Sequence, residues 1–290
     1  MITSPNVLLS KDEIVKAYQE VDLVLDWSRQ ELFDRCHREA WFAYELGWQD
    51  GRPGDPLIFG SLLSQALETM NPNVFDGYKE VGLYPRDNRT AGKGRDLLDL
   101  YVRKFGAADS KKYDVVANEY PFGIKTRVAD KTVLVKGRLD QLLKDKETGL
   151  YWIKEYKHSA AYMKNQDDYF KPYFLGGQTG YYRWAVSQIF GEDSVGGVII
   201  DLFKVTKQAT DDMDLVRKII DDFEIEWDGF DEVVREWFMA REYGFHRSVK
   251  SCTRYNSLCP FYPVCKGTTT NEDAMRRAGL TKKEENSWHR

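Results

Sequence analysis

The stretch KGRLDQLLKDKETGLYWIKEYK, residues 136–157, decides the fold because it contains two β-rich segments joined by a turn. If residues 146–149 form a four-residue hairpin loop, Asp145 pairs with Leu150. Counting away from the turn, back from Asp145 and forward from Leu150, places Asp140 directly opposite Glu155. Lys157 lies two residues beyond Glu155, so its side chain points to the same face of the sheet.

This arrangement predicts a metal site. Two carboxylates that face each other across a strand pair repel, and a hard divalent cation such as Mg²⁺ relieves the repulsion. An ammonium group beside that cation can orient a water and stabilise the charge that develops in phosphodiester hydrolysis. The alternative is a solvated hairpin with ordinary surface charges, and a register slip of one residue would move Asp140 to the other face.

Patterns outside the hairpin predict an α/β fold, with a mixed central β-sheet flanked by helices. One domain is expected over residues 1–270, comprising a helical region (1–110), a catalytic α/β core (111–206), and acidic helices with a cysteine segment (207–270). Residues 271–290 are expected to be a polar tail. The expected helices cover 10–48, 57–70, 95–105, 170–190 and 211–243, and the expected strands cover 114–122, 125–129, 131–143, 150–156 and 195–205.

Composition narrows the class of protein. The chain is 42% hydrophobic and 30% charged, which is ordinary for a globular protein and excludes wholesale disorder. The net charge of −4 conceals an asymmetry, because residues 211–236 carry −8 and the remainder therefore carries +4. Such a mildly basic body is compatible with a DNA partner. Neither a membrane span nor a signal peptide is evident, so a cytoplasmic location is expected.

The hairpin pattern, Asp140 followed by Glu155-Tyr156-Lys157, resembles the PD-(D/E)xK nuclease superfamily, specifically its RecB-like branch. Residues 27–44 (WSRQELFDRCHREAWFAY) resemble the N-terminal helix of that branch, and residues 178–182 (QTGYY) resemble its Gln-x-x-x-Tyr helix. The terminal cysteines resemble the iron–sulfur segment of AddB-type and CRISPR-associated members. The resemblance implies a restriction-endonuclease-like core and a metal-dependent nuclease.

The resemblance also assigns roles to residues. Asp140 and Glu155 would bind Mg²⁺ or Mn²⁺, and Lys157 would be the catalytic lysine. Gln178 and Tyr182, one helical turn apart, would contact DNA or support the site, although plain helix packing also explains them. Glu119 lies where relatives often carry a Glu, but a solvated strand charge is the preferred interpretation.

One position departs from the family pattern. RecB-like enzymes often have a metal-binding His on the helix that begins at Gly60, and this chain has Ser64 there. Glu68, one turn further on, is a candidate replacement ligand, the alternative being an exposed helix charge. The four histidines give no substitute, and His158 is expected to point away from the face of Lys157.

The four cysteines predict a second centre. Cys252, Cys259 and Cys265 lie close together near the C-terminus, and Cys36 would join them from the N-terminal helix. The intervals of six and five residues fit a [4Fe–4S] cluster better than zinc, whose ligands usually come in closer pairs, while free buried thiols are a further alternative. A cluster would clip the C-terminal segment to the first helix. The basic residues around the cysteines form a patch suited to a phosphate backbone, or a solvated loop: Arg247, Lys250, Arg254 and Lys266.

The favoured function is a metal-dependent DNA exonuclease that acts on single strands or duplex ends and is stabilised by a [4Fe–4S] cluster. A non-catalytic DNA-binding or assembly subunit is the first alternative, motivated by Ser64, and a zinc-stapled interaction module is the second. Protein partners in recombination, CRISPR adaptation or viral DNA processing are compatible with the sequence.

Overall fold

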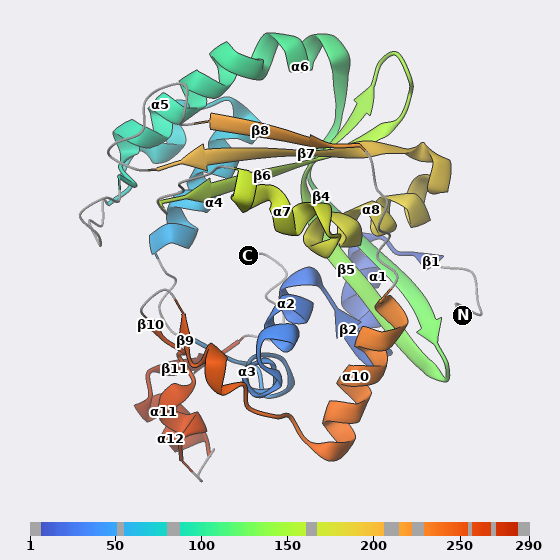
Figure 1. Cartoon of the computed structure of the whole chain (residues 1–290), viewed down its shortest axis with the longest axis vertical. Helices are drawn as coiled ribbons and strands as arrows, with labels where there is room; N and C mark the ends of the chain where they lie inside the picture. Colours follow the sequence, from blue (N-terminus) through green and yellow to red (C-terminus); the bar gives the residue numbers. More distant parts are fainter. Residues whose placement is uncertain are drawn as a thin grey trace. The chain divides into compact units, whose positions relative to one another are not determined.

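The computed structural model describes residues 7–50, 55–79, 88–160, 167–205, 215–221, 229–254, 257–267 and 271–283 (Figure 1). The chain forms two compact units. Unit 1 comprises Met1–Pro53, Gly123–Lys136 and Asp228–Arg290, and unit 2 comprises Gly54–Phe122 and Gly137–Trp227. The nuclease domain over residues 1–270 stays a prediction.

Unit 2 is built on a mixed β-sheet. Its strands belong to the sheet order β4 (Tyr113–Val128), β5 (Lys131–Asp145), β6 (Tyr151–Ser159), β7 (Val195–Lys204) and β8 (Leu215–Ile220). Residues 123–128 of β4 and 131–136 of β5 belong to unit 1. β6 runs antiparallel to β5 and parallel to β7, and β8 is antiparallel to β7. The predicted fold class, a mixed sheet flanked by helices, is therefore confirmed.

The turn between β5 and β6 sets the register that the sequence predicted. The Asp145 N–H donates to the Leu150 carbonyl at 2.9 Å. The Asp145 carboxylate accepts hydrogen bonds from the backbone of Glu147 and Thr148, which closes the turn. The strand pairs that follow run from Lys144 with Tyr151 to Gln141 with Lys154. The predicted register is confirmed over these pairs, and its continuation by one residue would set Asp140 opposite Glu155.

Helices cover both faces of this sheet. They are α4 (Asp55–Thr69), η2 (Pro72–Phe75), α5 (Ala91–Tyr101), η3 (Val102–Gly106), α6 (Ala107–Lys112), α7 (Asp167–Phe174), α8 (Gly177–Phe190) and η4 (Glu192–Ser194). Helices α4 and α5 pack their apolar side chains against Tyr156 and Phe203. Helix α8 covers the other face, because its Gln178 contacts Glu155 and Lys157, which alternate with Tyr156 along β6.

Unit 1 contains the two ends of the chain. Its elements are β1 (Val7–Leu8), α1 (Lys11–Ala17), β2 (Leu23–Leu25), α2 (Trp27–Arg35), α3 (His37–Ala40), η1 (Trp41–Glu45), β3 (Trp48–Asp50), α10 (Phe230–Tyr243), η5 (Val249–Ser251), β9 (Thr253–Arg254), β10 (Ser257–Leu258), α11 (Tyr262–Cys265), α12 (Glu272–Arg277) and β11 (Leu280–Lys282). Ser10 and Glu13 form a capping box at the start of α1. Phe33 of α2 stacks on Trp237 of α10, with ring centroids 4.4 Å apart.

Two predicted boundaries were wrong. Strand β4 runs without a break through residues 123–124, where the sequence suggested two strands, because Gly123 stays extended and lies against Ile14, leaving no room for a side chain. The expected helix over 170–190 is divided into α7 and α8. Gly176 and Gly177 adopt φ values of 94° and 50°, which an α-helix cannot continue through.

The acidic segment over 211–243 was also predicted wrongly in part. Residues 215–220 form strand β8 instead of a helix, since Val216 and Ile219 are β-branched and Arg217 pairs with Asp201 of the neighbouring β7. Helix α10 supplies the acidic helix that was expected, but only over residues 230–243. The rest of the acidic segment, 211–214 and 222–228, lies outside the described residues.

The polar tail predicted over 271–290 is structured in its first half. Asn271 caps α12, and β11 pairs antiparallel with β3. Met275 and Leu280 are buried in a cluster with Phe42 and Val264, so two apolar residues in a polar stretch anchor it. Within the described part of the chain, no helix has the length and apolar character that crossing a membrane requires.

Candidate functional site

The predicted catalytic residues Asp140, Glu155 and Lys157 are gathered on one face of β5 and β6. The Asp140 carboxylate accepts a hydrogen bond from the backbone N–H of Tyr156 at 2.8 Å. The Lys157 ammonium donates to Glu155 Oε1 at 2.6 Å. Glu155 is only 5% exposed, and Asp140 is half-buried. The two strands thus hold two carboxylates and one ammonium together, as the register implied.

The electrostatics of this group are unbalanced. Burial, followed by the negative charge of Glu155, raises the pKa of Asp140 well above its usual range. Burial acts to lower the pKa of Lys157, but the charges of Glu155 and Asp140 outweigh it and raise that pKa. Glu155 Oε2 is buried and has no hydrogen-bond partner among the described residues. A buried carboxylate oxygen without a hydrogen-bond partner destabilises the folded protein. This oxygen therefore indicates a position where a cation or a hydrogen-bond donor binds.

Gln178 connects the helix α8 to this group. Its Oε1 accepts a hydrogen bond from Lys157 at 2.8 Å, and its Nε2 donates to Glu155 Oε1 at 3.2 Å. Tyr182, one turn along α8, accepts a hydrogen bond from Gln178 Nε2 at 3.1 Å. The structure therefore brings together the two residues that the sequence paired, and it places them against the lysine and the buried carboxylate.

A second pair of carboxyl groups lies close by. The interpretation of Glu119 as a solvated strand charge was wrong, because its half-buried side chain pairs with Arg138. Burial, followed by the interaction with the Glu119 carboxyl group, raises the pKa of Glu68 to about 7. The charge of Glu119 also contributes to the raised pKa of Asp140. Glu119 therefore influences the pKa values of both Glu68 and Asp140.

For Glu119, the usable signal in the sequence was that relatives often carry a Glu at this strand position, and Tyr169 had no such signal. Glu119 follows Asn118 in a strand whose residues should alternate, yet its φ of 48° turns it out of the regular pattern. Tyr169 of α7 is a residue that the sequence did not single out. Its hydroxyl contributes to the raised pKa of Lys157, which places it beside the lysine. The two remaining neighbours behave as expected, with His158 bonded to the Pro56 carbonyl on the far face and Ser64 half-buried on α4.

The carboxylate group is suited to a hard divalent cation, although it is incomplete as a ligand set. Asp140 and Glu155 supply oxygen donors, and Glu155 Oε2 is an unused one. In the part of the chain that the structure describes, no three His, Cys, Asp or Glu side chains lie close enough to share a single ion. The fit to Mg²⁺ or Mn²⁺ therefore rests on two protein carboxylates, a number that Mg²⁺ sites completed by water commonly use.

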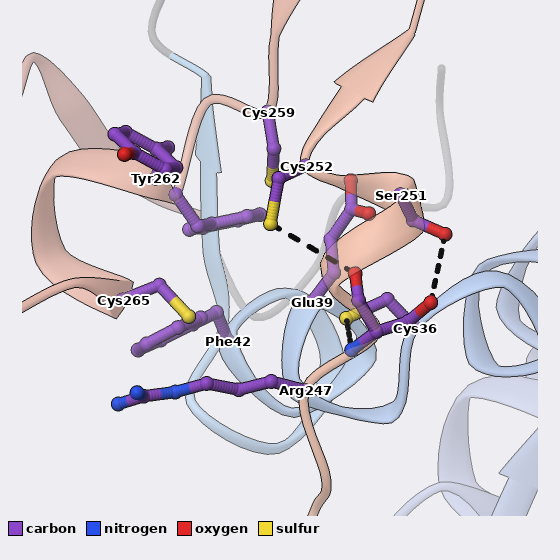
Figure 2. Close-up of a pocket in the computed structure, with 11 residues that line it drawn as sticks. Cys36, Glu39, Phe42, Arg247, Ser251, Cys252, Cys259, Tyr262 and Cys265 are labelled. Atoms are coloured by element: carbon purple, nitrogen blue, oxygen red, sulfur yellow. Dashed lines mark hydrogen bonds between the residues drawn. The ribbon is translucent and has the colours of Figure 1, made fainter.

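The four cysteines gather around one pocket in unit 1. Cys36, Cys252, Cys259 and Cys265 line it, together with Phe42 and other apolar side chains (Figure 2). The Ser248 N–H donates to Cys36 Sγ at 3.4 Å, and the Cys252 thiol donates to the Ser248 carbonyl at 3.8 Å. Four sulfur donors from three segments of the sequence thus share one concave surface, which suits a soft metal centre.

Burial raises the pKa of the Cys259 thiol to about 12 and also raises that of Cys265, which Arg247 opposes. Binding of a metal centre would therefore release protons from these thiols. Arg247 lines the pocket and is exposed, as is Lys250. Arg254 lies in β9, and its side chain is outside the described part.

Comparison with known protein families identifies the superfamily of the chain. The family model described as PD-(D/E)XK nuclease superfamily matches residues 27–266, and the chain belongs to this superfamily. The match spans both the carboxylate hairpin and all four cysteines. The expectation from the sequence is confirmed at the level of the superfamily, while the RecB-like branch stays a prediction.

Solved structures resemble the chain weakly. The crystal structure of SSO0001 has a TM-score of 0.40 at 12% identity, over 79% of this chain and 82% of that one. The Rai1 protein of Scheffersomyces stipitis, crystallised with (3'-NADP)⁺ and calcium, has a TM-score of 0.30 at 15% identity, over 79% of this chain. This chain spans 64% of that Rai1 chain. Among curated proteins, no sequence matches this one.

Proposed function

We propose that this protein is a metal-dependent nuclease of the RecB-like branch that hydrolyses DNA from single strands or duplex ends. The observation that carries the proposal is the buried group of Asp140, Glu155 and Lys157, in which Glu155 Oε2 has no hydrogen-bond partner among the described residues. Membership of the PD-(D/E)XK nuclease superfamily supports a nucleic-acid substrate.

Each residue of the group has a role in this proposal. Asp140 and Glu155 would hold Mg²⁺ or Mn²⁺, which when bound supplies Lewis acidity and a water of lowered pKa. Lys157 keeps its proton because both carboxylates raise its pKa, so it stabilises negative charge that develops on the phosphate oxygens. Gln178 fixes the position of the Lys157 ammonium, and Tyr182 fixes Gln178 in turn.

The nuclease proposal is tested with end-labelled and circular DNA, with Mg²⁺, Mn²⁺ or EDTA. We expect degradation of the end-labelled strand that requires the metal, that spares the circle, and that Lys157→Ala abolishes. Lys144→Ala, at an exposed lysine of the neighbouring strand, is the matched control. Cleavage of circular DNA would replace the exonuclease assignment by an endonuclease, and undiminished activity of Lys157→Ala would reject the proposed centre.

We also propose that the four cysteines bind a [4Fe–4S] cluster. Two observations support a cluster over zinc. The sulfurs share one pocket with apolar side chains, and no three described Cys side chains approach closely enough to bind a single ion. Thiolates around a multi-iron cluster need not approach so closely. The Ser248 N–H that donates to Cys36 Sγ is the kind of hydrogen bond that stabilises cluster thiolates.

Metal and sulfide analysis of anaerobically purified protein distinguishes an iron–sulfur cluster from zinc. We expect about four iron and four sulfide per chain, with broad visible absorption that dithionite bleaches and that Cys259→Ser removes. Ser257→Ala, two residues away, is the matched control. Colourless protein with stoichiometric zinc would instead support a zinc-stapled module.

A non-catalytic DNA-binding subunit is the second candidate. Ser64 stands where relatives carry a metal-binding His, and the described residues place only two carboxylates together for one ion. This function predicts DNA binding that survives EDTA and no hydrolysis with any divalent metal, so the assay above distinguishes it.

A further inference from the structure

Unit 1 contains a second concentration of partly buried charge, away from its cysteines. Four cationic side chains from four separate elements converge there: Arg29 of α2, Lys136 of β5, Arg241 of α10 and Lys283 directly after β11. We call them the basic cluster. Bringing four like charges together from distant parts of the sequence opposes folding unless opposite charges compensate them. The cluster therefore requires an explanation.

Aromatic rings hold the cations at short range. The Arg29 guanidinium and the Lys283 ammonium lie 5.1 and 4.6 Å from the centroid of the same ring, that of Tyr44. The Lys136 ammonium lies 4.9 Å from the ring centroid of Tyr18. Cation–π contacts of this kind stabilise each charge by about 0.5–2 kcal/mol, but they do not neutralise it.

The carboxylates in contact with the cluster, among the described residues, are too few to balance it. Glu45 is used by both arginines, at 2.7 Å from Arg29 and 2.9 Å from Arg241. Asp26 lies 3.7 Å from Lys136, and it also accepts the backbone N–H of Arg29 as the cap of α2. The ion pairs among the described residues thus give these four cations two carboxylates, which leaves an excess of positive charge in this part of the structure.

The excess is buried enough to be costly. The Arg29 side chain is 9% exposed and that of Lys136 is 20% exposed. Burial lowers the pKa values of Arg29, Lys136 and Lys283, and repulsion between these cations contributes to the shifts. Arg29 Nε is also buried, with no hydrogen-bond partner in the described part of the chain. The buried Arg29 Nε and the mutual repulsion of these cations both favour an anion as a binding partner.

We propose that the basic cluster is a binding site for a phosphate group of a nucleic acid. A phosphate offers several acceptor oxygens at once, so it can accept hydrogen bonds from more than one cation of the cluster. The proposal rests on the proposed function in one respect, the assumption that the phosphate belongs to a nucleic acid. A backbone phosphodiester and a terminal phosphate share the same chemistry, and the experiment separates them.

The test compares Lys136→Gln and Lys283→Gln with Lys282→Gln, an exposed lysine adjacent to Lys283. The first measurement is the shift in Tm that inorganic pyrophosphate produces. The second is the affinity for short oligonucleotides that carry a 5′-phosphate or a 5′-hydroxyl, measured in EDTA over a range of salt. In the two cluster variants we expect the pyrophosphate shift to disappear. We also expect nucleic-acid affinity to fall about tenfold, with a salt dependence reduced by about one charge.

Each outcome decides the proposal. Equal losses on both oligonucleotides assign the site to a backbone phosphate, and a loss confined to the 5′-phosphorylated strand assigns it to a terminal one. Cluster variants that respond like Lys282→Gln overturn the proposal. Cluster variants with a lower Tm in buffer and an intact pyrophosphate shift also overturn it, because they indicate a purely structural role. An absence of hydrolysis, with the pyrophosphate shift intact, rejects the nuclease but retains the phosphate site.

Discussion

The two faces of strand β6 differ in how far their buried charges are paired with opposite charges. On one face, Lys154 is 1% exposed and donates to Asp109 and to the hydroxyl of Tyr101, both at 2.5 Å. Arg217 then bridges Asp109 and the fully buried Asp201 through four hydrogen bonds. Every charge on this face has an opposite charge within reach.

On the other face, one residue further along, the balance fails. Asp140 and Glu155 provide two carboxylates, and Lys157 is the cation that bonds Glu155 and acts on the pKa of Asp140. Glu155 Oε2 has no hydrogen-bond partner among the described residues. The same strand therefore contains a satisfied network and an unsatisfied one. The satisfied network requires no ligand to explain it, and the unsatisfied one indicates where a ligand binds.

The largest effect is expected on the satisfied face. Lys154→Met leaves Asp109 and Asp201 without one of their cations, and breaking a buried pair in this way costs about 3–5 kcal/mol. We expect the free energy of unfolding in urea to fall by that amount. Lys144→Met, at an exposed lysine on β5, is the control and should change stability little. A stable Lys154→Met protein would show that this network contributes no more than surface charges do.

The opposite result is expected for Asp140→Asn. The substitution removes one of two repelling carboxylates, so the metal-free protein should be as stable as the wild type or more stable. Hydrolysis should nevertheless fall by about 10²–10³-fold, because the substitution weakens binding of the metal ion that would stabilise transition-state charge. Rates at saturating Mn²⁺ and urea denaturation in EDTA measure the two effects.

Glu147→Gln, in the exposed turn of the same hairpin, is the control for Asp140→Asn. A variant that loses stability together with activity would contradict the contrast between the faces, because it would assign Asp140 a structural role.

The sequence predicted one of these faces much better than the other. The unsatisfied face depends on local information, since the turn after Asp145 fixes the register and the register fixes which residues oppose each other. The satisfied face depends on β8, whose Arg217 reaches both Asp109 and Asp201. Residues 211–236 are so acidic that a helix was expected there, and the partner strand that overrides local propensity is not visible in the segment itself.

Glu119 shows the same limit within the candidate site. Its strand was predicted correctly, and alternation along a regular strand gave no reason to place it near Glu68. The left-handed φ of 48° at Glu119 changes the direction of its side chain, and its contact with Arg138 lies across the sheet. Backbone irregularities of this kind depend on tertiary packing, so periodicity cannot reveal them.

A smaller effect is expected for Gln178→Ala. The variant removes the acceptor that holds the Lys157 ammonium and a donor to Glu155, while both charged groups remain. We expect kcat to fall about tenfold, within the range for a hydrogen bond to a charged group. Since Gln178 positions Lys157, the pH profile of the activity should shift as well. Gln188→Ala on the same helix is the control, and equal activity of the two variants would remove Gln178 from the site.

The smallest effect tests whether a raised carboxylate pKa marks a ligand site wherever it occurs. Asp34 in unit 1 has its pKa raised from 3.8 to about 6, by burial first and then by the charges of Glu236 and Glu31. The folded protein therefore binds this proton more tightly than the unfolded chain does, and its stability falls as the pH rises from about 4 to about 6.

Because Asp34 is exposed to solvent, screening limits the effect to less than about 1 kcal/mol. Asp34→Asn should match the wild type below pH 4 and exceed it slightly at pH 7 in urea denaturation, with nuclease activity and metal affinity unchanged. Asp193→Asn, at an exposed acid of unit 2, is the control. If Asp34→Asn weakened metal binding or hydrolysis, exposed acids would belong to the site too, and burial would lose its value as the criterion that separates Asp140 and Glu155 from the other carboxylates.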